Sequence, residues 1–130
     1  MQKDFDNWNN KKKLIHNTGE NKLYHAREIW WCNLGINVGS EEDGTGLDYE
    51  RPVLILRGLG TNTCFVMPLT TSKSRHPMRI AIGAIEKGGK ENSVIISQMR
   101  IIDTRRLINK IGFLDKEKFE VIRKTIREMF

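Results

Sequence analysis

Residues 51–71, RPVLILRGLGTNTCFVMPLTT, decide the fold class of this chain. Two apolar runs rich in β-branched residues, 52–56 and 63–69, flank the turn-forming segment GLGTN at 58–62. Runs of this length, separated by glycine and asparagine, are typical of antiparallel strands joined by a turn. Pro68 interrupts the second run and predicts a bulge or a strand end there, because proline cannot donate to a ladder.

Runs of the same kind lie on both sides of this segment. They are EIWWCN at 28–33, MRIAI at 78–82, SVII at 93–96 and KIGFL at 110–114. The segments SKSRHP at 72–77 and EKGGKEN at 86–92 separate them and are rich in turn formers. This spacing predicts an antiparallel sheet or small barrel, and it excludes βαβ units.

The pattern changes to helical periodicity after Asp115. Apolar residues recur there at steps of three and four: Phe119, Ile122, Ile126 and Met129. This indicates an amphipathic C-terminal helix, with Asp115 as its N-cap. Asp103 starts a second, short helix over 103–107. The predicted fold is therefore mainly β with a C-terminal α-helix.

Length and charge limit the function classes. The chain has 130 residues, which is the size of one domain and excludes a multidomain enzyme. Its net charge of +6 and pI near 9.5 favour a polyanionic partner, with nucleic acid as the first candidate. The sequence contains no apolar run of membrane-spanning length and no signal-peptide core, so we expect a cytoplasmic protein without a membrane partner.

Cysteine and histidine usage gives no sign of a metal or cofactor. Cys32 and Cys64 each lie within an apolar run, which predicts buried, reduced thiols and no disulfide. The three histidines are scattered and lack the spacing of zinc ligands. We therefore expect no cofactor and no structural metal.

Two segments stand apart from the strand pattern. Residues 1–26 form an N-terminal extension that is either a helix or a partly ordered arm. Residues 41–50, EEDGTGLDYE, carry five carboxylates directly before Arg51 and predict an acidic loop. This loop is either a mobile lid over the basic residues C-terminal to it or a solvated loop pointing away from them.

Four motifs occur in an order that resembles the MazF/PemK family of toxin endoribonucleases. They are REIWWCNLGINVGSEE at 27–42, RPVLIL at 51–56, FVMPLT at 65–70 and SVIISQMRIIDTRRLINKIGFL at 93–114. The resemblance implies an SH3-like β-barrel over residues 27–130 and a homodimer. It also implies metal-independent, sequence-specific cleavage of single-stranded RNA and neutralisation by a cognate antitoxin. The N-terminal extension and the long acidic loop depart from the family pattern.

The resemblance assigns catalytic roles to Arg51 and Thr70. Arg51 matches the family's catalytic arginine in the RP motif, and Thr70 matches its catalytic threonine after the PL pair. Cleavage by 2′-hydroxyl attack needs stabilisation of a dianionic phosphorane, which a guanidinium and a hydroxyl can supply. By sequence alone, Arg51 could instead pair with the acidic loop. A one-residue error in the match would transfer the role of Thr70 to Thr71.

The substrate-binding candidates surround these two residues in sequence. They are Gly39, Ser40, Glu41, Thr71, Lys73, Arg75, His76, Arg79 and Gln98. Small residues in the GSE triplet permit close approach of a ligand, and the basic residues suit phosphates. His76 is an alternative general acid or base. The competing interpretations are an ordinary turn for the triplet, a solvated loop for the basic residues and a structural role for Gln98.

Trp30 and Trp31 suggest a stacking platform for unpaired bases. Adjacent side chains of a strand point to opposite faces, so we expect one of the two in the core and the other at an interface.

Three functions remain open on the sequence. The leading one is an RNA-cleaving toxin. The second is a non-cleaving toxin of the same fold that binds a protein target, as the gyrase-binding toxin CcdB does. The third is a degenerate member that binds RNA without cutting it. The presence of both Arg51 and Thr70 in their motifs favours cleavage.

Overall fold

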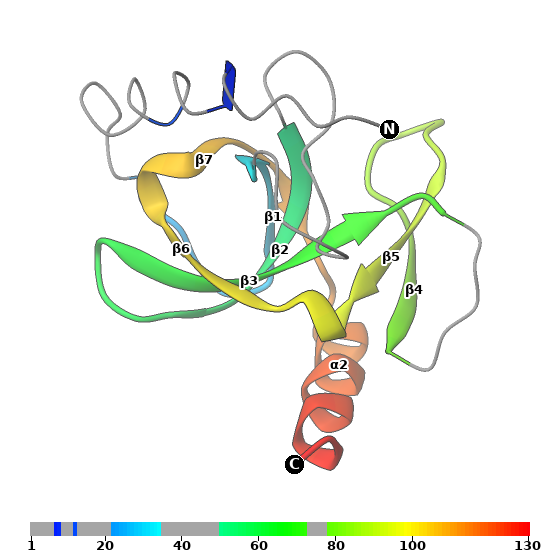
Figure 1. Ribbon diagram of the computed structural model, residues 1–130. Helices are drawn as coiled ribbons and strands as arrows, with labels where there is room; N and C mark the ends of the chain where they lie inside the picture. The colour runs from blue at the N-terminus through cyan, green and yellow to red at the C-terminus, as the bar shows by residue number, and fades with distance from the viewer. Residues whose placement is uncertain (1–6, 9–11, 13–21, 35–49, 73–77) are drawn as a thin grey trace.

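The computed structural model describes residues 7–8, 12, 22–34, 50–72 and 78–130. The strands are β1 (Glu28–Asn33), β2 (Glu50–Gly58), β3 (Thr63–Thr70), β4 (Arg79–Ala84), β5 (Glu91–Ile95), β6 (Arg100–Asp103) and β7 (Leu107–Phe113). Helix α2 (Lys116–Glu128) comes after them, and two 3-10 turns, η1 (Ile96–Gln98) and η2 (Thr104–Arg106), flank β6. Figure 1 shows the strands curling around one another, with α2 below them. The predicted mainly β class with a C-terminal helix is confirmed.

All strand pairs are antiparallel, and the sheet runs in the order β4-β5-β3-β2-β1-β7. Strand β6 branches from this path by pairing with β3. Among the described residues no ladder joins β6 to β7, although η2 connects them directly. The small barrel is therefore a curled sheet that hydrogen bonds do not close.

Strand β3 has two successive partners along one of its edges. Thr63–Val66 pairs with β6, while Leu69 and Thr70 pair with β5. Pro68 lies between the two ladders, at a point where no described residue pairs with this edge, so its missing N–H removes no hydrogen bond from either ladder. The prediction of a bulge or strand end at Pro68 was wrong, because β3 continues to Thr70. Strand β6 was not predicted.

Two core clusters use the two faces of the sheet. Val53 and Ile55 belong to one cluster and Leu54 to the other, as the alternation of a strand requires. The cluster containing Leu54 also takes Phe119 and Ile122 from α2. Asp115 caps the helix by accepting a hydrogen bond from the Lys118 backbone N–H at 2.9 Å, as predicted. The predicted short helix is η2, where Asp103 accepts from the Arg105 backbone N–H.

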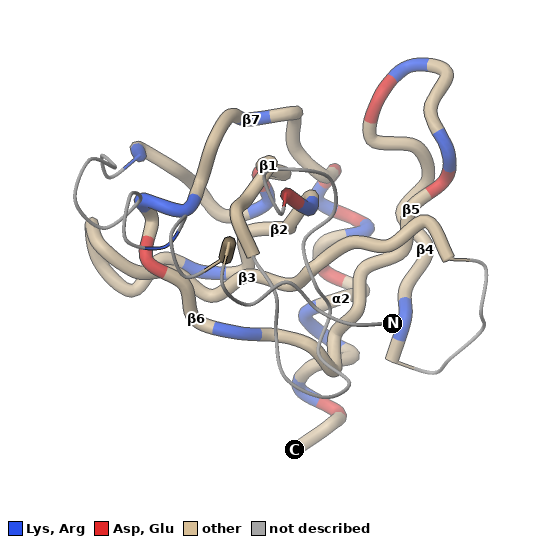
Figure 2. The backbone as a smooth tube through the Cα atoms, turned by 45° about the horizontal axis from the view of Figure 1, so that its top comes forward, with Lys and Arg blue, Asp and Glu red and all other residues tan. Residues whose placement is uncertain are grey.

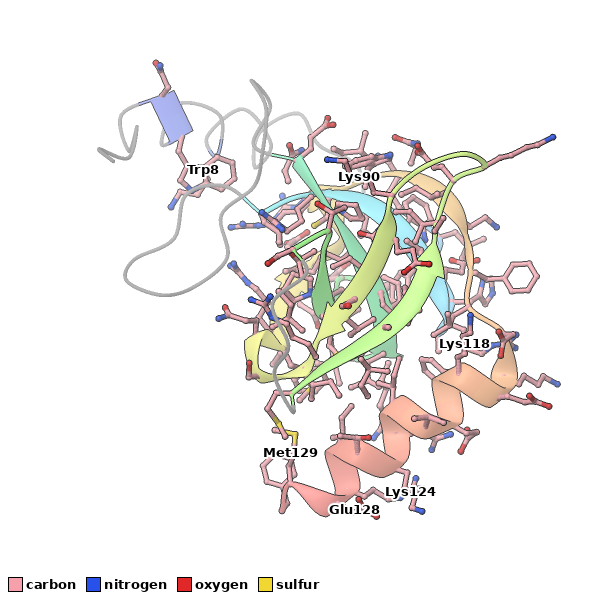
Figure 3. The ribbon with its side chains drawn as sticks, turned by 90° about the vertical axis from the view of Figure 1, so that its right-hand side faces the viewer. Trp8, Lys90, Lys118, Lys124, Glu128 and Met129 are labelled. Atoms are coloured by element: carbon pink, nitrogen blue, oxygen red, sulfur yellow. The ribbon has the colours of Figure 1, made fainter. Side chains whose placement is uncertain are left out.

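The N-terminal extension lies mostly outside the described ranges, so the choice between helix and arm stays open. Asn7, Trp8 and Lys12 have helical conformation. Trp8 is only 4% exposed, and the Arg106 guanidinium lies 5.5 Å from the centre of its ring. Figure 3 shows Trp8 at the upper left, away from Lys90 of the β4–β5 hairpin.

Cys32 and Cys64 are buried and free, as predicted. Burial raises the pKa of Cys32 to about 12. No helix in the described part of the chain is both long and apolar enough to cross a membrane.

Candidate active site

A cavity of about 520 Å³ opens where the ends of β2 and β3 meet the β4–β5 hairpin. Its walls come from four parts of the chain. They are Trp31 of β1, Arg51 and Pro52 of β2, the run Leu69, Thr70, Thr71 and Ser72, and Ile85, Glu86, Gly89, Lys90 and Asn92 of the hairpin and the start of β5. The volume lies in the range of ligand sites, and the walls combine apolar surface with a few polar groups.

Strand register brings Arg51 and Thr70 together. Val53 pairs with Pro68 in the β2–β3 ladder, and the same register, continued by two residues, places Arg51 opposite Thr70. Arg51 is half-buried, and its Nη1 donates a hydrogen bond to the Leu69 carbonyl at 3.0 Å. That bond holds the guanidinium at the cavity wall beside Thr70.

Thr70 is buried, with 7% of its surface exposed, whereas Thr71 and Ser72 are exposed. The Thr70 Oγ1 accepts a hydrogen bond from the Ser72 backbone N–H at 3.1 Å. A hydroxyl can accept one bond and donate another, so this contact orients the oxygen while its proton can serve an anionic ligand. Thr71 lines the same cavity, but its exposed hydroxyl is not held by such a contact within the described ranges.

One of the two adjacent tryptophans is in the core, as predicted, and the interface role of the other stays a prediction. Trp30 belongs to the core, where its Nε1 donates to Glu28 Oε1 at 3.0 Å. Trp31 is half-buried and forms part of the cavity wall. Trp31 is therefore the aromatic side chain with access to a ligand.

Arg79 and Gln98 are described but do not line this cavity. Arg79 pairs with Ile95 at the far end of the β4–β5 ladder, and Gln98 ends η1. The Nη1 atom of Arg79 is buried and has no hydrogen-bond partner within the described ranges. Their substrate-binding roles stay predictions.

The other candidates belong to segments that the structure leaves undescribed. These are Gly39, Ser40, Glu41, Lys73, Arg75 and His76. The acidic loop lies there as well, apart from Glu50, which begins β2 opposite Asn33. Both interpretations of the loop therefore remain open.

Sequence reasoning missed the hairpin side of the cavity. The pattern of EKGGKEN indicates only a turn, yet Glu86, Lys90 and Asn92 of this segment line the same cavity as Arg51. The two glycines and two lysines of this segment are the features that could have indicated a binding role. Figure 2 shows basic and acidic residues together on this hairpin.

Comparisons with known proteins agree with this arrangement. Residues 25–130 match the family described as PemK-like, MazF-like toxin of type II toxin-antitoxin system. Endoribonuclease EndoA of Bacillus subtilis (strain 168) is 32% identical over 102 residues, which cover 73% of this chain and 84% of that protein.

Solved structures share the fold. MazF from Deinococcus radiodurans superposes with a TM-score of 0.68 at 19% identity, covering 83% of this chain and 96% of that one. Mycobacterium tuberculosis toxin MazF-mt6 gives a TM-score of 0.61 at 21% identity, covering 78% and 94%. Since the family match spans most of the chain and the curated relative exceeds 30% identity, the chain belongs to the MazF/PemK family of toxins of type II toxin-antitoxin systems.

Proposed function

We propose that this protein is a metal-independent endoribonuclease toxin that cleaves single-stranded RNA, including mRNA, at specific sequences. The observation that supports the proposal is that Arg51 and Thr70 both line one open cavity, at the ends of two paired strands. Its relative EndoA is an endoribonuclease, which supports the same activity here.

In the proposed reaction the 2′-hydroxyl gives its proton to water as its oxygen bonds to the adjacent phosphorus. The bond from phosphorus to the 5′-oxygen breaks, and the 5′-oxygen takes a proton from water. The products are a 2′,3′-cyclic phosphate and a 5′-hydroxyl. Arg51 stabilises the extra negative charge on the phosphorane, because its planar fork matches two phosphate oxygens. The Thr70 hydroxyl donates a hydrogen bond to a phosphate oxygen in the same transition state and keeps its proton. A guanidinium stays protonated, so Arg51 acts through charge and does not transfer the proton.

The proposal includes the biological setting that the family implies. Residues 27–130 form the toxin domain, residues 1–26 are an extension, and the protein works in the cytoplasm as a homodimer. Its partner is a cognate antitoxin, as in the MazE-MazF complex of Deinococcus radiodurans, a solved structure with the same fold. Light scattering should give about twice the chain mass of 15.1 kDa, and a monomer at micromolar concentration would contradict the dimer.

The test of function is incubation of the purified protein with long RNA in EDTA, and then analysis of the fragment ends. We expect discrete fragments that carry 2′,3′-cyclic phosphates and 5′-hydroxyls. Binding without fragments would identify the degenerate RNA-binding member. Neither binding nor cleavage, in a folded protein, would favour a protein target.

A further inference from the structure

We propose that the β4–β5 hairpin is part of the RNA-binding site, that Lys90 binds a phosphate next to the scissile one, and that Asn92 is a positioning residue for Lys90. This inference rests on the proposed cleavage of RNA. It assigns a second wall of the site to a segment that carries no catalytic motif.

Lys90 and Asn92 line the same cavity as Arg51 and Thr70. Strand β5 pairs with the end of β3, where Thr70 lies opposite Ser93, the residue after Asn92. A single strand passing Arg51 carries a phosphate on each nucleotide, so the phosphates beside the scissile one must lie near these walls. Lys90 is exposed, and Figure 3 places it at the end of the sheet opposite α2. An ammonium group on a flexible stem suits a phosphate there as a point charge.

The turn of the hairpin has a defined backbone geometry, and this geometry sets the position of the Lys90 backbone. The Gly89 backbone N–H donates to the Glu86 carbonyl at 3.0 Å, closing a four-residue turn. Gly88 has a φ of 75° at the third position, as a type II turn requires, and glycine adopts that angle without strain. A side chain on Gly89 would come within 3.2 Å of the Glu86 carbonyl oxygen.

Asn92 fixes the backbone of Lys90 directly. Its side chain is buried, with 6% of the residue exposed, and its Nδ2 donates to the Lys90 carbonyl at 3.2 Å. A buried amide is costly unless it is paired, so this contact favours one path of the chain at Lys90. Asn92 therefore acts on the ligand through Lys90.

The other strand of the hairpin is also fixed. A β-bulge between Ala81 and Gly83 sets Gly83 opposite Asn92, with Gly83 at a φ of 84°. The carbonyl of Ile82, the extra residue of the bulge, accepts from Lys118 Nζ of α2 at 3.1 Å. A bulge bends its strand and changes the direction of the chain after it. The hydrogen bond from Lys118 of α2 thereby helps to fix the orientation of the β4–β5 hairpin.

The hairpin contains three charged residues that differ in their access to the cavity or in the sign of their charge: Glu86, Lys87 and Lys90. Lys87 is exposed on the same turn but does not line the cavity, whereas Lys90 does. Glu86 also lines the cavity and opposes anion binding. The proposal therefore predicts opposite effects of neutralising Lys90 and Glu86, and almost none for Lys87.

The test measures binding of a fluorescent 2′-O-methyl RNA, which lacks the nucleophile, at several salt concentrations. Lys90→Gln should lower affinity and reduce the slope of log affinity against log salt by about 0.7, the value for one phosphate of a single strand. Lys87→Gln, the matched control, should leave both unchanged, and Glu86→Gln should tighten binding. Equal behaviour of Lys90→Gln and Lys87→Gln would overturn the assignment of Lys90.

Asn92 is tested by a double-mutant cycle, because truncating it can also affect folding. Asn92→Ala should weaken RNA binding in the wild-type background but add little in the Lys90→Gln background, which a purely structural role would not produce. Additive losses in folded proteins would overturn the positioning role. Different results contradict the proposed function and the role of Lys90. A wild-type protein that does not cleave RNA contradicts the function. If the wild-type protein cleaves RNA but Lys90→Gln does not change RNA binding, only the role of Lys90 is contradicted.

Discussion

The Arg51 end of β2 and the Glu28 end of β1 place charged side chains in opposite environments. Glu28 is 9% exposed and accepts hydrogen bonds from Trp30 Nε1 at 3.0 Å, the His25 backbone N–H at 2.8 Å and Lys110 Nζ at 3.3 Å. Arg51 is half-buried, borders a cavity and donates to a main-chain carbonyl. The buried carboxylate joins β1 to β7 and to the preceding segment, whereas the guanidinium borders space for a ligand. The comparison predicts that Glu28 matters for stability and Arg51 for activity.

The largest effect is expected for Arg51→Ala. RNA cleavage should fall by a factor on the order of 10² to 10³, the range for removing one preorganised donor to a transition state. Thermal unfolding should change little. Arg57→Ala is the matched control, because Arg57 is exposed near the other end of the same strand and does not line the cavity. Wild-type cleavage by folded Arg51→Ala protein would remove Arg51 from the site.

Thr70→Ala tests which hydroxyl acts at this end of the sheet. Cleavage should fall by about 10², since the buried Thr70 has a fixed orientation beside Arg51. Thr71→Ala should have a much smaller effect, because Thr71 is exposed. The rates of both variants are compared on the same RNA. The reverse order would show that the family match is displaced by one residue.

Glu28→Ala should act on stability instead. Its removal leaves the buried indole N–H of Trp30 without its acceptor, which costs about 1 to 3 kcal/mol in the free energy of unfolding. The measurement is denaturant unfolding, with Glu120→Ala as control. Glu120 forms an exposed pair with Arg123 and should contribute less than about 1 kcal/mol. Cleavage per folded molecule should be preserved in both variants, and a selective loss in Glu28→Ala would break the comparison.

The smallest effect is a dependence of stability on pH through Glu28. Burial opposes ionisation, but hydrogen bonds from Trp30, His25 and Lys110 outweigh it and lower the pKa of the carboxyl below its ordinary value of 4.5. Because the pKa is lower in the folded protein than in the unfolded chain, the stabilisation is complete above the unfolded pKa. It is lost as the pH falls through the folded pKa. The stability difference between wild type and Glu28→Gln should therefore narrow as the pH falls from about 6 to about 3. A constant difference would mean that the charge on Glu28 does not contribute.

Much of the local structure was predictable from the sequence. The first predicted strand has the bounds of β1, and the Asp115 cap begins α2 as expected. Turn formers, strand composition and helical periodicity act over a few neighbouring residues, so they can be read without the fold. Arg51 and Thr70 were identified in a different way, by the resemblance of their short motifs to those of the MazF/PemK family.

Pairing over long distances could not be predicted in this way. The change of partner along β3, the short β6 between two 3-10 turns, and the separation of Arg79 and Gln98 from the cavity all depend on which strands meet. No local pattern encodes that choice.

The sequence by itself determined the type of most elements, the cap of α2 and, through their motifs, the choice of Arg51 and Thr70 as candidate site residues. Only the tertiary structure decided that EKGGKEN lines the same cavity as Arg51 and that Trp31 borders this cavity while Trp30 is buried. It also decided that Lys110 of the distant β7 donates to Glu28. The physical reason is the distance along the chain over which each interaction acts. Backbone preferences and caps act within a turn or two of chain, whereas a cavity and a buried carboxylate exist only after distant strands have paired and excluded water.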